Sequence, residues 1–150
     1  MYYFFKFFAT GFGAGLLPKA PGTWGTLLAV LPYYFMQFLP TSTYLAVAIG
    51  FIFFAVWISS NAIKIYDDDD PSIVVIDEVA GFFVAMLFVP FSWLLVGIGF
   101  GLFRLFDIWK PWPISLIDKR LGGGWGVVFD DVIAGIYTCV LLNLFERLVL

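Results

Sequence analysis

The chain contains no histidine and one cysteine, Cys139. A lone cysteine cannot form a disulfide within the chain, and the lack of histidine removes the commonest general base. Zinc sites built from histidine and cysteine are excluded for the same reason. The remaining chemistry uses carboxylates, lysine, arginine and hydroxyl groups, and a hard metal ion is the natural partner for carboxylates.

Charged residues are also scarce, at 13% of the chain, whereas 62% of residues are hydrophobic and the mean hydropathy is +0.98. Soluble domains are about 45–50% apolar. A chain of 150 residues has too little interior to hide this excess, so lipid is the expected solvent. The net charge of -3 provides no basic field for nucleic acid. We therefore expect a single membrane-embedded domain over residues 1–150, with no nucleic-acid partner and no obligate protein partner.

Long apolar stretches predict an all-α, polytopic membrane bundle. They cover residues 26–39, 44–63, 79–106 and 132–150. A spanning helix needs about 17–25 residues, so the third stretch is too long for one span. Pro90 lies in its middle and favours a helical hairpin. The opening residues 1–8 form a short apolar run interrupted by Lys6, which predicts a first helix rather than a signal peptide.

The distribution of basic residues supports the hairpin. If the chain turns at Pro90, all basic residues except Arg147 face one side, whereas a single long helix would divide them. Those on the shared side are Lys6, Lys19, Lys64, Arg104, Lys110, Lys119 and Arg120. Cytoplasmic loops carry the excess of lysine and arginine, so this side is predicted to face the cytoplasm.

Four tryptophans occur in the polar segments of the chain. They are Trp24, Trp109, Trp112 and Trp125. Membrane interfaces favour tryptophan, which agrees with polar segments at a bilayer surface. Ordinary core packing is the alternative explanation.

Paired acidic residues mark the polar segments that we expect to meet on this face. Asp77 and Asp131 each precede an apolar run, where aspartate commonly caps a helix. Capping does not explain their acidic neighbours Glu78 and Asp130, because adjacent carboxylates repel unless a positive group lies between them. Together with Asp107 from another segment, these carboxylates predict a Mg²⁺ site.

Arg104, Asp107 and Lys110 are spaced to share one helical face before a proline stops the helix. A solvated ladder of salt bridges is the alternative. The neighbouring residues are apolar, however, and charged side chains in such a setting usually have a function. We expect Arg104 and Lys110 to bind phosphate and Asp107 to bind metal.

The glycine-rich residues 11–23 could bring backbone N–H groups and Lys19 to the same phosphate. Taken alone, that segment is better explained as a tight connection between two helices.

The acidic run of residues 67–70 predicts a solvated loop, and we place it outside the site. Its four like charges precede a proline, and no buried strand end is predicted there that would present an aspartate nucleophile.

Four blocks of sequence match a known family in order and spacing. They are Ala9-Thr10-Gly11-Phe12-Gly13 with Pro21-Gly22-Thr23, Ile76-Asp77-Glu78 with Gly81, Phe103-Arg104-Leu105-Phe106-Asp107 with Lys110-Pro111-Trp112-Pro113-Ile114, and Gly123 with Gly126 and Asp130-Asp131-Val132-Ile133-Ala134-Gly135. With these blocks, the chain resembles the phosphatidylglycerophosphatase A family over nearly its whole length. The resemblance implies a Mg²⁺-dependent phosphatase of the bacterial inner membrane that hydrolyses phosphatidylglycerophosphate to phosphatidylglycerol and phosphate. The residues alone indicate only a metal-dependent enzyme acting on an anionic, membrane-resident substrate.

The expected mechanism is metal-assisted hydrolysis. The candidate metal ligands for one or two Mg²⁺ ions are Asp77, Glu78, Asp107, Asp130 and Asp131, and the candidate phosphate-binding residues are Arg104, Lys110 and Lys19. One carboxylate serves either as a general base or as a nucleophile, and the sequence leaves both routes open.

Three alternatives to this function remain. A phosphatase for another lipid phosphate, such as phosphatidate or a polyprenyl phosphate, is the nearest. A cation transporter would need acids inside the spans rather than at their ends. A purely structural membrane protein would not need paired acids beside arginine and lysine.

Overall fold

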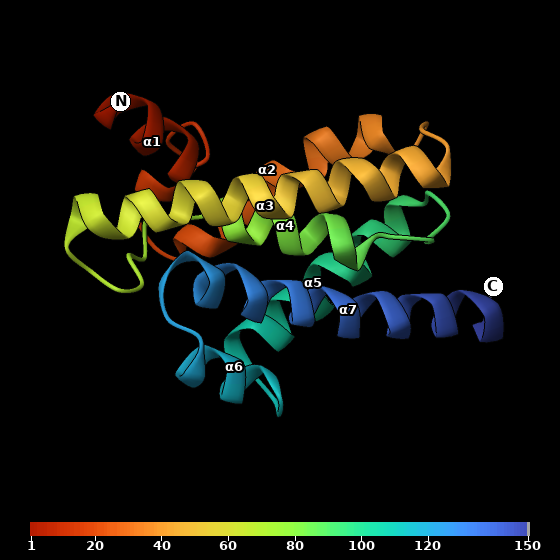
Figure 1. Cartoon of the computed structure of the whole chain (residues 1–150). Coiled ribbons are helices and arrows are strands. Elements are labelled where there is room, and N and C mark those ends of the chain that lie inside the picture. The colour runs from red at the N-terminus through yellow and green to blue at the C-terminus, as the bar shows by residue number, and fades with distance from the viewer. Residues whose placement is uncertain (150) are drawn as a thin grey trace.

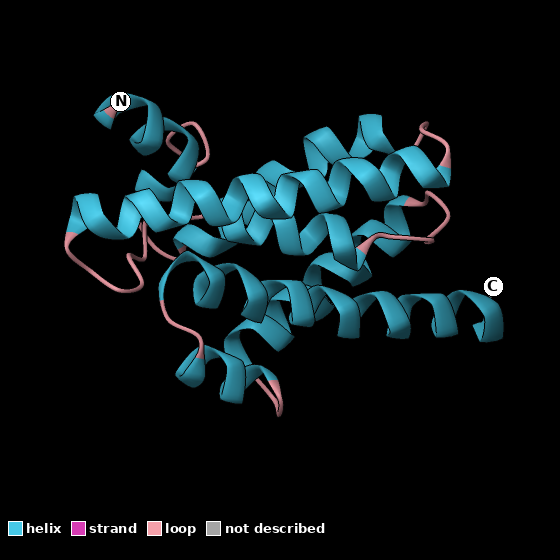
Figure 2. Ribbon diagram, viewed as in Figure 1, coloured by secondary structure: helices cyan, strands magenta, loops and turns pink. Residues whose placement is uncertain are grey.

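A computed structural model describes residues 1–149, and every regular element in that range is helical (Figure 2). The elements are α1 (Tyr2–Ala9), the 3₁₀ turn η1 (Ala14–Leu16), α2 (Pro21–Met36), α3 (Thr41–Tyr66), α4 (Ile76–Ala85), α5 (Trp93–Trp109), α6 (Ile114–Arg120) and α7 (Gly123–Val149). The predicted all-α class is confirmed, and the opening residues form a first helix as expected.

The third apolar stretch is broken near Pro90, as predicted. α4 ends at Ala85 and α5 begins at Trp93, and the connection between them contains Pro90, which lacks an N–H group and cannot continue a helix. This connection lies at the same end of the bundle as the turn between α2 and α3 (Figure 1). The start of α4 and the end of α5 therefore meet at the opposite end.

The start of α7 differs from the prediction. This helix begins at Gly123 rather than near residue 132, although glycine is a poor helix former. Close packing explains the difference, because a Cβ atom at Gly124 would lie only 2.5 Å from the carbonyl oxygen of Val56 on α3. Asp130 and Asp131 consequently lie well inside α7, so capping is not their role.

α4 is the central helix, and it packs against α2, α3 and α7. Two glycines bring α4 and α7 close together. A Cβ atom at Gly81 would lie 2.6 Å from the carbonyl oxygen of Asp131, and one at Gly135 would lie 2.3 Å from that of Gly81. Small residues allow such close helix contacts. Asp77 and Asp131 each precede one of these glycines by four residues, so the contact also brings the two aspartates together.

Two helices, α3 and α7, are long and apolar enough to cross a membrane by length and composition. Large apolar side chains such as Leu31, Phe53 and Val140 are exposed on the bundle. The four tryptophans of the polar segments are exposed as well, from 40% for Trp24 to 76% for Trp112, so core packing does not explain them. These features indicate association with a membrane.

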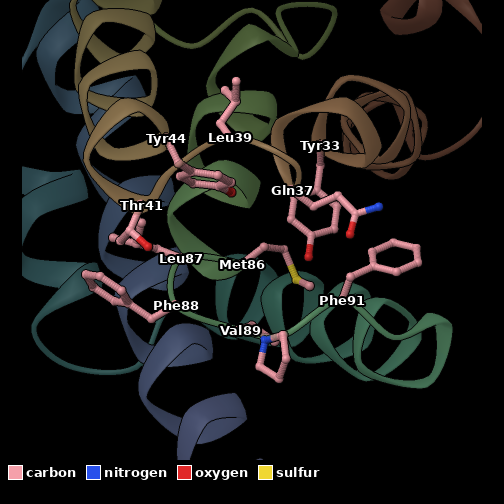
Figure 3. Close-up of a pocket in the computed structure, with 11 residues that line it drawn as sticks. Tyr33, Gln37, Leu39, Thr41, Tyr44, Met86, Leu87, Phe88, Val89 and Phe91 are labelled. Carbon is pink, nitrogen blue, oxygen red and sulfur yellow. The ribbon is translucent and has the colours of Figure 1, made fainter.

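A neutral cavity of about 290 Å³ lies where α2 and α4 end (Figure 3). Tyr33, Gln37 and Tyr44 supply polar groups to its lining, which contains no acidic or basic residue. We refer to it below as the far cavity.

Candidate active site

A cavity of about 240 Å³ lies where the starts of α2 and α4 meet the end of α5 and the early turns of α7. We call it the acid-lined cavity. Its charged lining residues are Asp70, Asp77, Glu78, Arg104, Asp107, Lys110, Asp130 and Asp131. The structure therefore brings together all five predicted carboxylates and two of the three predicted cations.

The carboxylates form two overlapping groups. Oxygens of Asp77, Glu78 and Asp131 lie within 4.8 Å of one another, and so do oxygens of Asp107, Asp130 and Asp131. Asp131 belongs to both groups. Carboxylate oxygens that share a hard divalent cation need this kind of proximity, so each group could hold one ion.

Several of these carboxylates are buried and lack protein partners. Asp77 and Glu78 are 7% and 8% exposed, and among the described residues neither Asp77 Oδ1 nor Glu78 Oε2 has a hydrogen-bond partner. Burial raises the pKa of Asp77 well above its usual range, and the charge of Glu78 raises it further. Burial also raises the pKa of Glu78, to about 7. Buried unpaired charge is costly, and a divalent cation would provide the missing positive charge, so these donors fit Mg²⁺.

Arg104 lies on α5 between two of these carboxylates. It forms an ion pair with Asp107 one turn later, and its Nη1 atom lies 3.8 Å from Glu78 Oε1. Its Nε atom is buried and has no protein partner among the described residues. The guanidinium group is therefore held at the cavity and retains a donor that no carboxylate uses.

Lys110 reaches the acid-lined cavity in a different way from the prediction. α5 ends at Trp109, and Lys110 has a φ of 47°, so it does not continue the helical face of Arg104 and Asp107. Its Nζ atom donates to Asp130 at 2.5 Å and to Asp118 at 3.0 Å. Burial alone would lower the pKa of Lys110, but the hydrogen bonds and charges of these two aspartates raise it above its ordinary value. The ammonium group is thus held in its charged form.

The structure separates Lys19 from the other predicted site residues. Lys19 is exposed and does not line the acid-lined cavity, whereas the next three residues, Ala20, Pro21 and Gly22, do. The glycine-rich opening therefore contributes its helix-starting turn to the cavity. A role for the Lys19 side chain in phosphate binding stays a prediction.

Two aspartates at the site were not assigned from the sequence. Asp70 is exposed, as expected for the acidic run, but it lines the acid-lined cavity while Asp67, Asp68 and Asp69 do not. Asp118 lies on α6 and pairs with Lys110. No local pattern distinguishes Asp70 from its acidic neighbours, and the Lys110–Asp118 pair depends on how α6 folds back.

The fold and the site together define a class: a helical protein with a cavity in which clustered carboxylates lie beside an arginine and a lysine, an arrangement suited to a metal ion and a phosphate group. Comparison with known proteins agrees. The family described as phosphatidylglycerophosphatase A matches residues 7–146. The chain belongs to this family, and it is an enzyme of the phosphatase class.

Individual relatives cover most of the chain. Phosphatidylglycerophosphatase A of Escherichia coli (strain K12) is 38% identical, over 89% of this chain and 78% of the relative. The protein of the same name from Haemophilus influenzae is 34% identical, over 89% and 83%. A Bacteroides thetaiotaomicron protein, provisionally named a phosphatidylinositol-3-phosphatase, is 39% identical, over 89% and 87%. No solved structure matches the chain.

Proposed function

We propose that this enzyme is a Mg²⁺-dependent phosphatase that hydrolyses the terminal phosphate monoester of phosphatidylglycerophosphate to give phosphatidylglycerol and phosphate. One observation carries the proposal: buried carboxylate oxygens of Asp77 and Glu78 lack protein partners in a cavity that also holds Arg104. The names of the Escherichia coli and Haemophilus influenzae relatives support this choice of substrate.

Each of the two carboxylate groups would bind one metal ion. Asp131 would hold an ion with Asp77 and Glu78, and the group of Asp107, Asp130 and Asp131 would hold a second. When bound, Mg²⁺ supplies positive charge beside the phosphoryl oxygens and lowers the pKa of a water molecule. One carboxylate of the cluster either accepts a proton from the attacking water or attacks the phosphorus atom itself.

Arg104 and Lys110 provide positive charge for the transferring phosphoryl group. Arg104 offers a planar fork of donors that suits two phosphate oxygens, and Lys110 offers a compact charge. Asp107 orients Arg104, while Asp118 and Asp130 orient Lys110. Because these contacts exist before substrate arrives, little reorganisation is needed as charge develops in the transition state.

We propose that the enzyme is a multi-pass protein of the bacterial inner membrane with the acid-lined cavity facing the cytoplasm. Lys64 lies in the last turn of α3 and Lys119 in the last turn of α6, both at the end of the bundle that holds this cavity (Figure 1). Arg147 lies near the C-terminus of α7, at the other end. Positive charge concentrates on cytoplasmic loops, which supports this orientation.

A second candidate is the hydrolysis of another lipid phosphate monoester. The Bacteroides thetaiotaomicron relative, at 39% identity, has a name that refers to a phosphoinositide and specifically favours this alternative. Phosphatidate and polyprenyl phosphate belong to the same class of substrate. Cation transport has less support, because the acids gather with Arg104 and Lys110 in one cavity at one end of the bundle.

The test is phosphate release by the purified full-length chain in detergent. The substrate panel contains phosphatidylglycerophosphate, phosphatidate, a polyprenyl phosphate and phosphatidylinositol 3-phosphate, each with Mg²⁺ and with excess EDTA. We expect the highest kcat/KM for phosphatidylglycerophosphate and no release without Mg²⁺. A higher kcat/KM for another lipid would reassign the substrate, and no release from any lipid would overturn the proposal.

A further inference from the structure

Gly22 lies in the first turn of α2 and lines the acid-lined cavity. A Cβ atom at this position would lie 2.3 Å from Glu78 Oε1, 2.8 Å from Arg104 Nη1 and 3.0 Å from Arg104 Nη2. Carbon atoms do not approach other heavy atoms this closely, so any side chain here would displace those groups. Two charged groups of the site thus use the space that a side chain would fill.

Other tightly packed glycines have different neighbours. Cβ atoms at Gly15, Gly126 and Gly135 would lie 2.1, 2.0 and 2.3 Å from backbone carbonyl oxygens. These glycines set distances between segments of backbone. Among the glycines of residues 1–149, Gly22 is the one whose nearest neighbours are charged side chains.

The backbone at Gly22 has little freedom to withdraw. Pro21 occupies the start of α2, where its fixed φ favours helix initiation. One turn later, a Cβ atom at Gly25 would lie 2.6 Å from Val75 Cβ, so α2 already touches the residue before α4. A side chain at position 22 must therefore push Glu78 and Arg104 away rather than move α2. Asp107 also pairs with Arg104, through the same Nη1 atom that approaches Glu78.

We propose that Gly22 is a positioning residue, whose missing side chain provides the room in which the Arg104 guanidinium sits against Glu78 and faces the cavity. This inference rests on the proposed function, since it concerns how Arg104 is presented to a phosphoryl group. Misplacing a binding group by about 1 Å can reduce a rate roughly 100-fold. A single methyl group at position 22 is sufficient to cause such a displacement.

The experiment compares Gly22→Ala with Gly101→Ala in the full-length chain. Gly101 lies on α5, the helix of Arg104, and a Cβ atom there would meet nothing within 4 Å. Both changes replace a helical glycine by a better helix former. We expect Gly22→Ala to lower kcat/KM for phosphatidylglycerophosphate by about 100-fold, and Gly101→Ala to leave it unchanged. The melting temperature of Gly22→Ala should stay near that of the wild type, because side chains rather than backbone move.

A double-mutant cycle separates positioning from a general structural role. In single-turnover assays, Gly22→Ala should cost little in an Arg104→Ala background, because the group that it displaces is gone and Glu78 has room to move aside. Equal losses in both backgrounds would overturn the inference. If Gly22→Ala fails to fold, the double variant should fold, since the guanidinium no longer collides with the new methyl group. A double variant that also fails to fold would overturn the inference as well.

Failure of this inference is distinguishable from failure of the proposed function. An active wild type with an equally active Gly22→Ala variant would remove the role of Gly22 and leave the function intact. A wild type that releases no phosphate from phosphatidylglycerophosphate would remove the function. In that case the space requirement is still tested by Mg²⁺ binding to the folded chain, which Gly22→Ala should weaken by displacing Glu78 and Gly101→Ala should leave unchanged.

Discussion

The acid-lined cavity and the far cavity are similar in size and opposite in chemistry. α2 begins at the acid-lined cavity of about 240 Å³ and ends at the far cavity of about 290 Å³. Figure 3 shows Tyr33, Gln37 and Tyr44 around the far cavity, and no acid or base lines it. The volume of a cavity therefore does not identify the site in this molecule. The convergence of opposite charges from separate helices does.

The two cavities also differ in what their buried polar groups require. In the far cavity, the Tyr44 hydroxyl donates to the carbonyl oxygen of Phe83 at 2.7 Å, while the Tyr33 hydroxyl has no partner among the described residues. An unsatisfied neutral group costs about 1–3 kcal/mol, which a fold can tolerate. Clustered buried carboxylates cost much more unless they are protonated or bind a cation. Such a cluster therefore indicates a ligand, whereas one unpaired hydroxyl does not.

Among the substitutions, the largest effect is expected from Asp131→Asn. Asn keeps the size of the side chain but removes a negative charge from both carboxylate groups, so phosphate release should fall by at least about 1,000-fold. Asp107→Asn should also abolish turnover. Initial rates over a Mg²⁺ series, with circular dichroism to confirm folding, provide the measurement. Rates near wild type for both variants would place the chemistry elsewhere.

Removal of Mg²⁺ should show directly which of the two cavities supports phosphate release. Excess EDTA is expected to stop phosphate release completely, and added Mg²⁺ should restore it, because the buried carboxylates need a cation to orient substrate. Tyr33→Phe, which alters only the far cavity, should show the same dependence on Mg²⁺ as the wild type. Full activity in a chelated, metal-free sample would contradict the metal-dependent mechanism.

Arg104→Lys should have an intermediate effect. Lysine keeps the positive charge but loses the planar fork, so we expect kcat/KM to fall by roughly 10- to 100-fold. The matched control is Arg147→Lys at the other end of the bundle, which should retain wild-type kinetics. Steady-state kinetics on phosphatidylglycerophosphate test both variants, and equal kinetics for the two would remove Arg104 from the phosphate-binding set.

Asp70→Asn tests the edge of the acid-lined cavity. Asp70 lines this cavity but is exposed, so solvent and salt screen its charge. We therefore expect only a few-fold change in kcat/KM. Asp67→Asn is the control from the same acidic run, because Asp67 does not line the cavity and asparagine tolerates its φ of 50°. We expect no change for this control. A dead Asp67→Asn variant would show that the whole acidic run had been misjudged.

The smallest effect should come from Tyr33→Phe in the far cavity. Removing a buried hydroxyl that has no partner relieves a desolvation cost, so the melting temperature should stay the same or rise slightly. Phosphate release should remain at the wild-type rate. A large loss of activity with unchanged stability would assign a function to the far cavity. The acid-lined cavity would then no longer differ from it in this respect.

Part of this architecture follows from local rules that apply to any chain. The helical class follows from the apolar stretches, and the break between α4 and α5 follows from Pro90. The early start of α7 could not be predicted locally, because glycine disfavours helices and only the contact of Gly124 with α3 compensates. The same limit applies to Asp118, which pairs with Lys110 only after α6 folds back.

By itself, the sequence determined which chemistry is available, namely that of carboxylates and cations without histidine. It also placed these groups beside apolar stretches that favour a lipid environment. It also determined the candidate carboxylates and the reversal of the chain at Pro90, since both depend on residue type and neighbouring positions. Only the tertiary structure decided that Asp131 belongs to both carboxylate groups and that Gly22 leaves room for Arg104. These relations join residues far apart in the chain. Their distances depend on which helix faces meet, and close contacts at small residues such as Gly81 and Gly135 set that meeting.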